Sequence, residues 1–164
     1  MQKELPRRKG LRLQGYDYSK TGCYFVTLCV KDGHALFGKI AETTALRRPY
    51  VDLTPLGICV NETIQKASKD GVMIDKYVIM PNHIHMIVAL HPEVSNRGQA
   101  GDRGRSPLHH VVRNIKSYVT KWAGFSMWQR SFHDHIIRDK DEYRMIRQYI
   151  GDNPARWFED KYFR

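Results

Sequence analysis

Two β-rich runs that meet at Pro81-Asn82 constrain the fold of this chain most. Residues 72–80 and 83–90 are largely β-branched and aliphatic, and the Pro-Asn break between them is a turn signal. We therefore predict two adjoining antiparallel strands. Side chains two apart on a strand share a face, so His83 and His85 are expected to point one way and the aliphatic residues between and after them the other way.

Turn and cap signals divide the first half of the chain further. Residues 24–31 form a β-branched and aromatic run that ends at Asp32-Gly33, and residues 34–40 are expected to return as its hairpin partner. Thr54-Pro55 is typical of a helix start, with proline at the first helical position. Apolar residues at helical spacing then predict a helix that runs to Asp70-Gly71.

The second half repeats these signals. Ser106-Pro107 is again a cap signature, and the following helix is expected to be apolar on one side, including Trp122, and basic on the other. Residues 127–138 are strand-like, although their pattern is mixed. Asp141 is expected to cap a short last helix that ends at Asn153-Pro154, because the residue before proline is biased away from the α region.

This order of elements predicts an α+β sandwich, an antiparallel sheet with helices on one face plus a short C-terminal helix, of which a split βαβ arrangement is the simplest version. A chain of 164 residues has the size of one domain. We expect a single domain over 1–164, with a basic arm at 1–20. The Gly- and Arg-rich residues 91–107 predict a flexible loop that could close over a substrate.

The charge balance indicates a polyanionic partner. The chain has 27 Lys and Arg against 17 Asp and Glu, a formal net charge of +10. Nucleic acid is the leading partner, and a merely soluble basic protein is the alternative. No apolar stretch is long enough for a membrane span or follows the basic N-terminus as in a signal peptide, so we expect no membrane partner and a cytoplasmic location.

His83 and His85 are candidate metal ligands. Imidazole is a common ligand of divalent metals, and a pair on one strand needs only one or two more donors to close a site with open positions. The alternative is two polar residues at the mouth of a strand. His133 and His135 form a second pair with the same spacing, for which DNA contact or packing is the other interpretation.

Tyr149 and Asn153 are four residues apart, so on a helix they lie on one face and can meet one target. A tyrosine hydroxyl can act as a covalent nucleophile, but its pKa of about 10 means that the electrophile must be strongly activated. A metal on a scissile phosphate would do this. The alternative is a core tyrosine followed by an asparagine that caps the helix.

Three blocks together resemble a known family. "YVIMPN" before His83, "WQRSFHDHIIR" over 128–138 and "QYIGDNP" over 148–154 are similar in order and spacing to single-tyrosine HUH transposases, especially the REP-associated tyrosine transposases. The resemblance implies a ferredoxin-like fold with a catalytic C-terminal helix. It also implies that His83, His85 and Asn153, where relatives carry glutamine, bind the metal, magnesium or manganese.

The same resemblance implies that Tyr149 attacks single-stranded or hairpin DNA and forms a 5′-phosphotyrosine, as a transposase that nicks and rejoins strands. It leaves open whether the protein is a monomer or a homodimer, and it implies association with a bacterial nucleoid. The alternative function is a domesticated binder of repeated palindromic DNA that no longer cleaves. The joint presence of both histidines, the tyrosine and the asparagine favours the enzyme.

Further basic and aromatic residues are candidate DNA contacts, as phosphate ligands or as a platform for an unpaired base. Terminal basic residues are often only solvated, and a tryptophan that opens a strand is often part of the core. The candidates are Arg7, Arg8, Lys9, Arg113, Lys116, Trp128 and Arg130.

Overall fold

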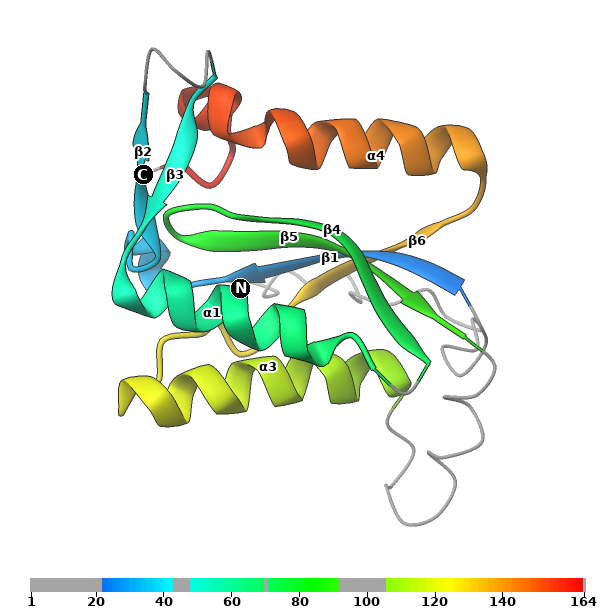
Figure 1. Cartoon of the computed structure of the whole chain (residues 1–164), viewed down its shortest axis with the longest axis horizontal. Helices are drawn as coiled ribbons and strands as arrows, with labels where there is room; N and C mark the ends of the chain where they lie inside the picture. The colour runs from blue at the N-terminus through cyan, green and yellow to red at the C-terminus, as the bar shows by residue number, and fades with distance from the viewer. Residues whose placement is uncertain (1–21, 43–47, 70, 92–105, 164) are drawn as a thin grey trace, which may run out of the picture.

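A four-stranded antiparallel sheet separates two helical layers in the computed structural model (Figure 1), which describes residues 22–42, 48–69, 71–91 and 106–163. The sheet has the order β4-β5-β1-β6, and a separate pair of strands, β2 and β3, lies at one end. The strands are β1 (Gly22–Cys29), β2 (Gly38–Ala41), β3 (Tyr50–Leu53), β4 (Val72–Ile79), β5 (His83–Leu90) and β6 (His133–Ile137).

The helices lie on both faces of this sheet. Helices α1 and α3 cover one face, and α4 crosses the opposite face (Figure 1). Their bounds are α1 (Pro55–Ala67), α3 (Pro107–Ala123) and α4 (Lys140–Asp152), with short 3-10 segments η1 (Lys31–Gly33) and η2 (Asn153–Glu159). The predicted α+β class is confirmed, including the helices on one face and the additional C-terminal helix.

The two faces of β5 have different neighbours, as its alternation predicts. Ile84, Met86 and Val88 are fully buried in the main core, which fills the space between the sheet and the α1/α3 layer. Ile87 points the other way and packs with Ile150 of α4 in a much smaller cluster. Burial of such aliphatic side chains stabilises both layers, and it places the histidines of β5 on the α4 side.

Several predicted elements are confirmed. Helix α1 begins after Thr54, whose hydroxyl accepts a hydrogen bond from the Gly57 amide at 3.1 Å. Strands β4 and β5 pair antiparallel, as the break at Pro81-Asn82 predicts. Helix α3 begins after Ser106, and its buried stripe faces α1, whereas Trp122 is 55% exposed and lies outside that stripe.

The predicted hairpin of residues 24–31 with 34–40 is wrong. Both edges of β1 are taken by distant strands, β5 on one side and β6 on the other. The Asp32-Gly33 signal does turn the chain, with both residues at positive φ, but β2 then pairs with β3. A turn signal fixes the local backbone and leaves the pairing partner open.

The last helix starts earlier than predicted. Asp139, and not Asp141, is the N-cap, because its Oδ1 accepts hydrogen bonds from the Asp141 and Glu142 amides. Glu142 in turn accepts from the amide of Arg138, the residue before the N-cap, at 2.7 Å, so both acidic side chains bind backbone amides at the start of α4. The strand expected over 127–138 is limited to β6.

The predicted arm at 1–20 lies outside the described residues, as does almost all of the predicted loop at 91–107. Within the described part of the chain, each helix is too short or too polar to cross a bilayer.

Candidate active site

His83 and His85 sit side by side on the α4 face of β5, next to the turn that follows β4. Their rings are 4.5 Å apart between centroids, and both side chains are almost completely buried. Two neutral polar rings in such a place need hydrogen-bond partners or a ligand.

The hydrogen bonds of Asn82 determine which nitrogen of His83 is free. The Asn82 amide nitrogen donates to the carbonyl oxygens of Gly33 at 3.1 Å and Tyr162 at 2.7 Å, so its Oδ1 is the acceptor. That oxygen lies 2.9 Å from His83 Nδ1, which must therefore carry the proton. His83 Nε2 then carries no proton and has a free lone pair. It is buried without a hydrogen-bond partner among the described residues. This arrangement is typical of a metal-ligating histidine.

Burial keeps both imidazoles neutral. Desolvation, with a smaller contribution from the charge of Lys161, lowers the pKa of His83 to about 3. Desolvation, together with the charges of His83 and Lys161, also moves the pKa of His85 well below its usual value. Neither ring needs to lose a proton near pH 7 before it can bind a cation.

His85 links the sheet to the tyrosine of α4. Its Nδ1 lies 2.8 Å from the hydroxyl of Thr27, the residue directly opposite on β1. Its Nε2 lies 3.3 Å from the Tyr149 hydroxyl. The structure thus brings together two residues that are 64 positions apart in the sequence and that sequence analysis places in one site.

Tyr149 is partly accessible, with 38% of the residue exposed, and its ring packs edge-on against Phe25. Burial and the negative charge of Asp160 raise the pKa of its hydroxyl, whereas a hydrogen bond with Asn153 lowers it. The phenol is therefore protonated near neutral pH. A nearby positive charge is needed to make it a better nucleophile.

Asn153 follows α4 and is 2% exposed. Its backbone is right-handed, and the chain continues into η2, so it does not form the left-handed cap that ends many helices. Its Oδ1 is buried without a hydrogen-bond partner in the described part of the chain. An unpaired buried amide oxygen has the chemistry of a metal ligand, as the resemblance implies for this residue.

Asp160 was not predicted. Its carboxylate lies 3.8 Å from His83 Nε2, and one ligand atom from each of His83, His85 and Asp160 can be chosen within 4.8 Å of one another. Two imidazole nitrogens and a carboxylate oxygen are a donor set that divalent metals accept. The group could therefore hold a metal ion.

Tyr162 is a second residue of the site that the sequence does not predict. Its ring centroid lies 4.6 Å from that of His83 and 5.8 Å from that of His85. Burial and nearby negative groups raise the pKa of its hydroxyl. Residues 160 and 162 reach the histidines because the chain turns back after η2. No periodic pattern or motif in the sequence predicts this turn.

The second histidine pair lies elsewhere on the same face. His133 on β6 is exposed, and His135 forms an ion pair and hydrogen bond with Glu142 at the start of α4. Neither belongs to a three-residue metal group among the described residues. The structure thus gives His135 a contact with Glu142 at the start of α4, and no third metal ligand for this pair is found among the described residues.

The predicted DNA contacts are scattered. Arg113 and Lys116 are on α3, across the sheet from Tyr149. The Lys116 ammonium donates to the carbonyls of Gln129 and Ser131, and burial lowers its pKa to about 8. Trp128 is 8% exposed and packs on Phe37. Packing accounts for Lys116 and Trp128 without DNA; Arg130 is exposed, and Arg7, Arg8 and Lys9 lie outside the described residues.

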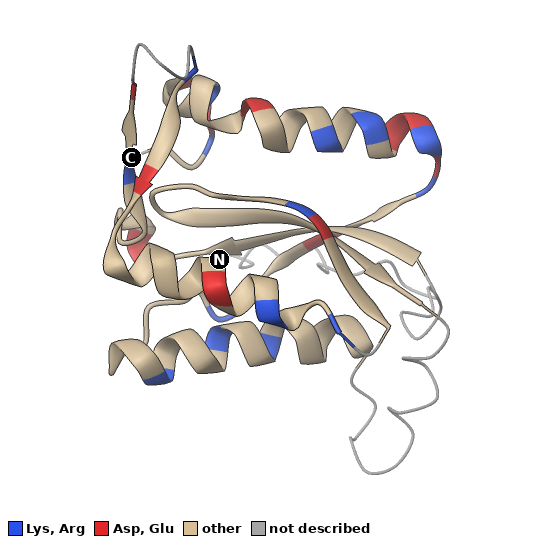
Figure 2. Ribbon diagram, viewed as in Figure 1, with Lys and Arg blue, Asp and Glu red and all other residues tan. Residues whose placement is uncertain are grey.

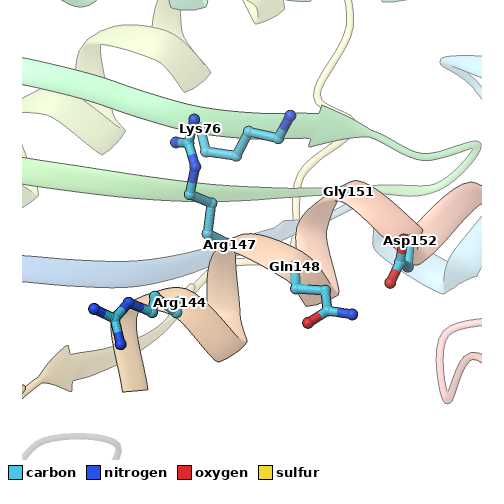
Figure 3. A pocket seen from close by; sticks show the side chains of 6 residues that line it. All are labelled: Lys76, Arg144, Arg147, Gln148, Gly151 and Asp152. Carbon is cyan, nitrogen blue, oxygen red and sulfur yellow. The ribbon is translucent and has the colours of Figure 1, made fainter. Parts of the chain in front are cut away.

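A shallow groove lies between α4 and β4. It has a volume of about 320 Å³ and is lined by Lys76, Arg144, Arg147, Gln148, Gly151 and Asp152 (Figure 3). Charged residues are concentrated in the half of α4 that begins at Lys140, whereas its other half carries few (Figure 2). Positive and negative groups are interleaved there, because Arg144 pairs with Asp141 and Arg147 with Asp75.

We expect Asn82→Ala to weaken binding of Mn²⁺ by about 10- to 100-fold, the usual cost of losing a partner that orients a ligand. The substitution removes the acceptor that holds the proton on His83 Nδ1. Calorimetric titration with Mn²⁺ measures the effect. Asn61→Ala is the control, because Asn61 lies on α1, on the opposite face of the sheet, where it accepts a hydrogen bond from Tyr77 of β4. Equal affinity in wild type and Asn82→Ala contradicts the role of Asn82.

Comparison with known proteins identifies relatives. A family described as "Transposase IS200 like" matches residues 40–153. A Haemophilus influenzae protein named "Uncharacterized protein" is 34% identical, over 95% of this chain and 93% of its own length. The REP-associated tyrosine transposase of Escherichia coli K12 is 32% identical over 84 residues, which are 51% of this chain and 44% of that protein.

Comparison of the fold with solved structures agrees with the sequence matches. A solved structure of a REP-associated tyrosine transposase bound to a REP hairpin has a TM-score of 0.58 and 25% sequence identity. The alignment covers 85% of this chain and 70% of that one. The resemblance stated from the three sequence blocks is confirmed.

Proposed function

Because the chain belongs to the IS200-like transposase family, we propose that it is a metal-dependent enzyme that nicks and rejoins single-stranded or hairpin DNA through Tyr149. Family membership supports a DNA transposase. The proposal adds three points to family membership: the metal ion, the tyrosine intermediate and the form of the DNA.

One observation carries it: the Tyr149 hydroxyl lies 3.3 Å from Nε2 of a histidine whose neighbour offers a buried, unpaired nitrogen. A tyrosine kept only for packing does not require an unpaired imidazole nitrogen, an unpaired amide oxygen and a carboxylate around it. These groups cost free energy when left without a partner. A bound cation would satisfy them together.

In the proposed reaction, the Tyr149 oxygen attacks a DNA phosphorus and the bond from phosphorus to the 3′ oxygen breaks. The phenol loses its proton to solvent, and the departing 3′ oxygen takes one up. The 5′ end remains on the enzyme as a phosphotyrosine, and a 3′-hydroxyl can later reverse the step. The bond energy is kept, so rejoining requires no nucleotide.

His83, His85, Asp160 and Asn153 would hold the metal, magnesium or manganese. When bound, the ion supplies positive charge that polarises the phosphate and stabilises the departing oxygen. The two neutral imidazoles favour manganese over magnesium, which prefers oxygen ligands. Asn82 and Thr27 orient the rings, and Asn153 holds the Tyr149 hydroxyl by a hydrogen bond.

The DNA substrate is proposed from a relative. The similar solved structure holds a REP hairpin, so a hairpin with a single-stranded flank is the first substrate to test. The net charge of +10 supports a polyanionic partner. We expect the protein to act in the bacterial cytoplasm at the nucleoid.

The proposal is tested with an end-labelled hairpin oligonucleotide, the full chain and Mn²⁺ or Mg²⁺. We expect nicked DNA and a protein–DNA adduct that survives denaturing electrophoresis, and both should disappear with EDTA. Binding without a nick under any metal condition supports the non-cleaving binder instead. Nicking that persists in EDTA contradicts the metal-dependent mechanism.

A further inference from the structure

Strand β4 contains a bulge that aims an aspartate at the helix of Tyr149. Its pairing with β5 shifts between Ile74 and Lys76, so Asp75 is an extra residue in the ladder. A bulge of this kind redirects a side chain and is often found next to functional sites. Here it lets two consecutive residues, Asp75 and Lys76, both reach the α4 side of the sheet.

Asp75 connects β4 to two residues of α4. Its Oδ2 accepts a hydrogen bond from the Tyr143 hydroxyl at 2.5 Å and another from Arg147 Nη1 at 2.6 Å. The Asp75 side chain is 23% exposed, so this contact is partly shielded from solvent. Figure 3 shows Arg147 reaching from α4 toward β4, beside Lys76.

The apolar contact beneath α4 is narrow. Ile150 is the fully buried hydrophobic residue of this helix, and it meets Ile87 and Ile137 in a small cluster. Tyr143 and Ile146 of α4 and three residues of the sheet, Cys23, Phe25 and Val78, pack against this cluster and are only partly buried. The other face of the sheet holds a far larger core. A helix seated on so few apolar side chains depends more on polar contacts for its position.

Tyr149 follows Arg147 by two residues on this helix. Its hydroxyl reaches His85 from α4, so a shift of α4 along the sheet would carry this hydroxyl away from His85. A displacement of about 1 Å at a reacting group can cost about a hundredfold in rate. Asp75 contacts Tyr143 and Arg147 of this helix, so its effect on Tyr149 would act through the position of α4.

We propose that Asp75 is a positioning residue, which holds α4 in register on the sheet through Tyr143 and Arg147 and so places Tyr149 for attack. The inference rests on the proposed function of Tyr149. It also gives the β4 bulge a role, because the bulge turns Asp75 toward α4.

The test compares single-turnover adduct formation by the full chain over a range of hairpin concentrations with Mn²⁺. We expect Asp75→Ala to lower the maximal rate by about 10- to 100-fold while the half-saturating DNA concentration stays within about twofold. Tyr143→Phe removes only a hydroxyl and should give a smaller loss in the same parameter. Because they share one bond, the two substitutions should be non-additive.

Asp141→Ala is the matched control. It also removes an aspartate paired with an arginine of α4, at 2.8 Å, but both partners belong to that helix and are exposed. We expect its maximal rate to equal that of the wild type. Hydrogen exchange of α4 amides should quicken in Asp75→Ala and not in Asp141→Ala, while the sheet amides stay protected.

The outcomes separate the two proposals. If the wild type forms no adduct, the proposed function fails. If it does, and Asp75→Ala and Tyr143→Phe keep its maximal rate, or Asp141→Ala loses as much, the inference about Asp75 is overturned. Should Asp75→Ala not fold, Tyr143→Phe with its intact ring decides the question.

Discussion

Tyr149→Phe is expected to abolish the covalent protein–DNA adduct and to leave hairpin binding within about twofold of the wild type. The substitution removes the attacking oxygen and keeps the ring that packs on Phe25. The Tyr149 hydroxyl lies 3.3 Å from His85 Nε2, whereas the Thr27 hydroxyl contacts the other ring nitrogen. Loss of a covalent nucleophile removes the step itself, so the effect should exceed every other in this account. Denaturing electrophoresis with labelled DNA measures it.

The control is Tyr118→Phe. Tyr118 is exposed on α3, across the sheet, and removal of its hydroxyl should leave adduct formation unchanged. If an adduct persists in Tyr149→Phe, the nucleophile lies elsewhere. Tyr162, whose ring also meets both histidines, is then the first candidate.

His85→Ala should reduce the affinity for Mn²⁺ by about a hundredfold or more, because loss of a direct ligand exceeds the cost of losing an orienting partner. DNA nicking should fall with it, since the proposed reaction requires the cation. Calorimetric titration without DNA gives the affinity independently of activity.

His133→Ala is the matched control for this prediction, and Thr27 of β1 shows why. It lies directly opposite His85 on one side of β1 and opposite His133 on the other. His133→Ala therefore removes an imidazole from the same face, on β6, two strands away from the β5 strand of His85, and should leave Mn²⁺ affinity unchanged. Equal losses in the two variants would contradict a metal site that is specific to His83 and His85.

Local signals in the sequence predict local structure well here. Thr54 and the Pro81-Asn82 break place α1 and the β4–β5 pair because caps and turns act within a few residues. Alternation along β5 likewise predicts the two neighbouring imidazoles. The predicted start of α4 is two residues too late, although Asp139 and Glu142 carry the capping-box spacing.

Long-range pairing is what the sequence leaves undecided. Residues 24–31 have the composition of a strand, yet nothing in them specifies β5 and β6 as partners in place of a hairpin. Asp160 shows the same limit at the site. A single carboxylate near the end of a chain carries no periodic signal, and it reaches His83 only through the turn after η2.

The most direct test of the account is to map the adduct. Wild-type protein is incubated with hairpin DNA and Mn²⁺, digested with nuclease and trypsin, and analysed by tandem mass spectrometry. The account predicts a nucleotide phosphate on the peptide that contains Tyr149, attached to that residue. A phosphate on Tyr162 or another residue, or cleaved DNA with free 5′-phosphate and no modified peptide, would contradict it.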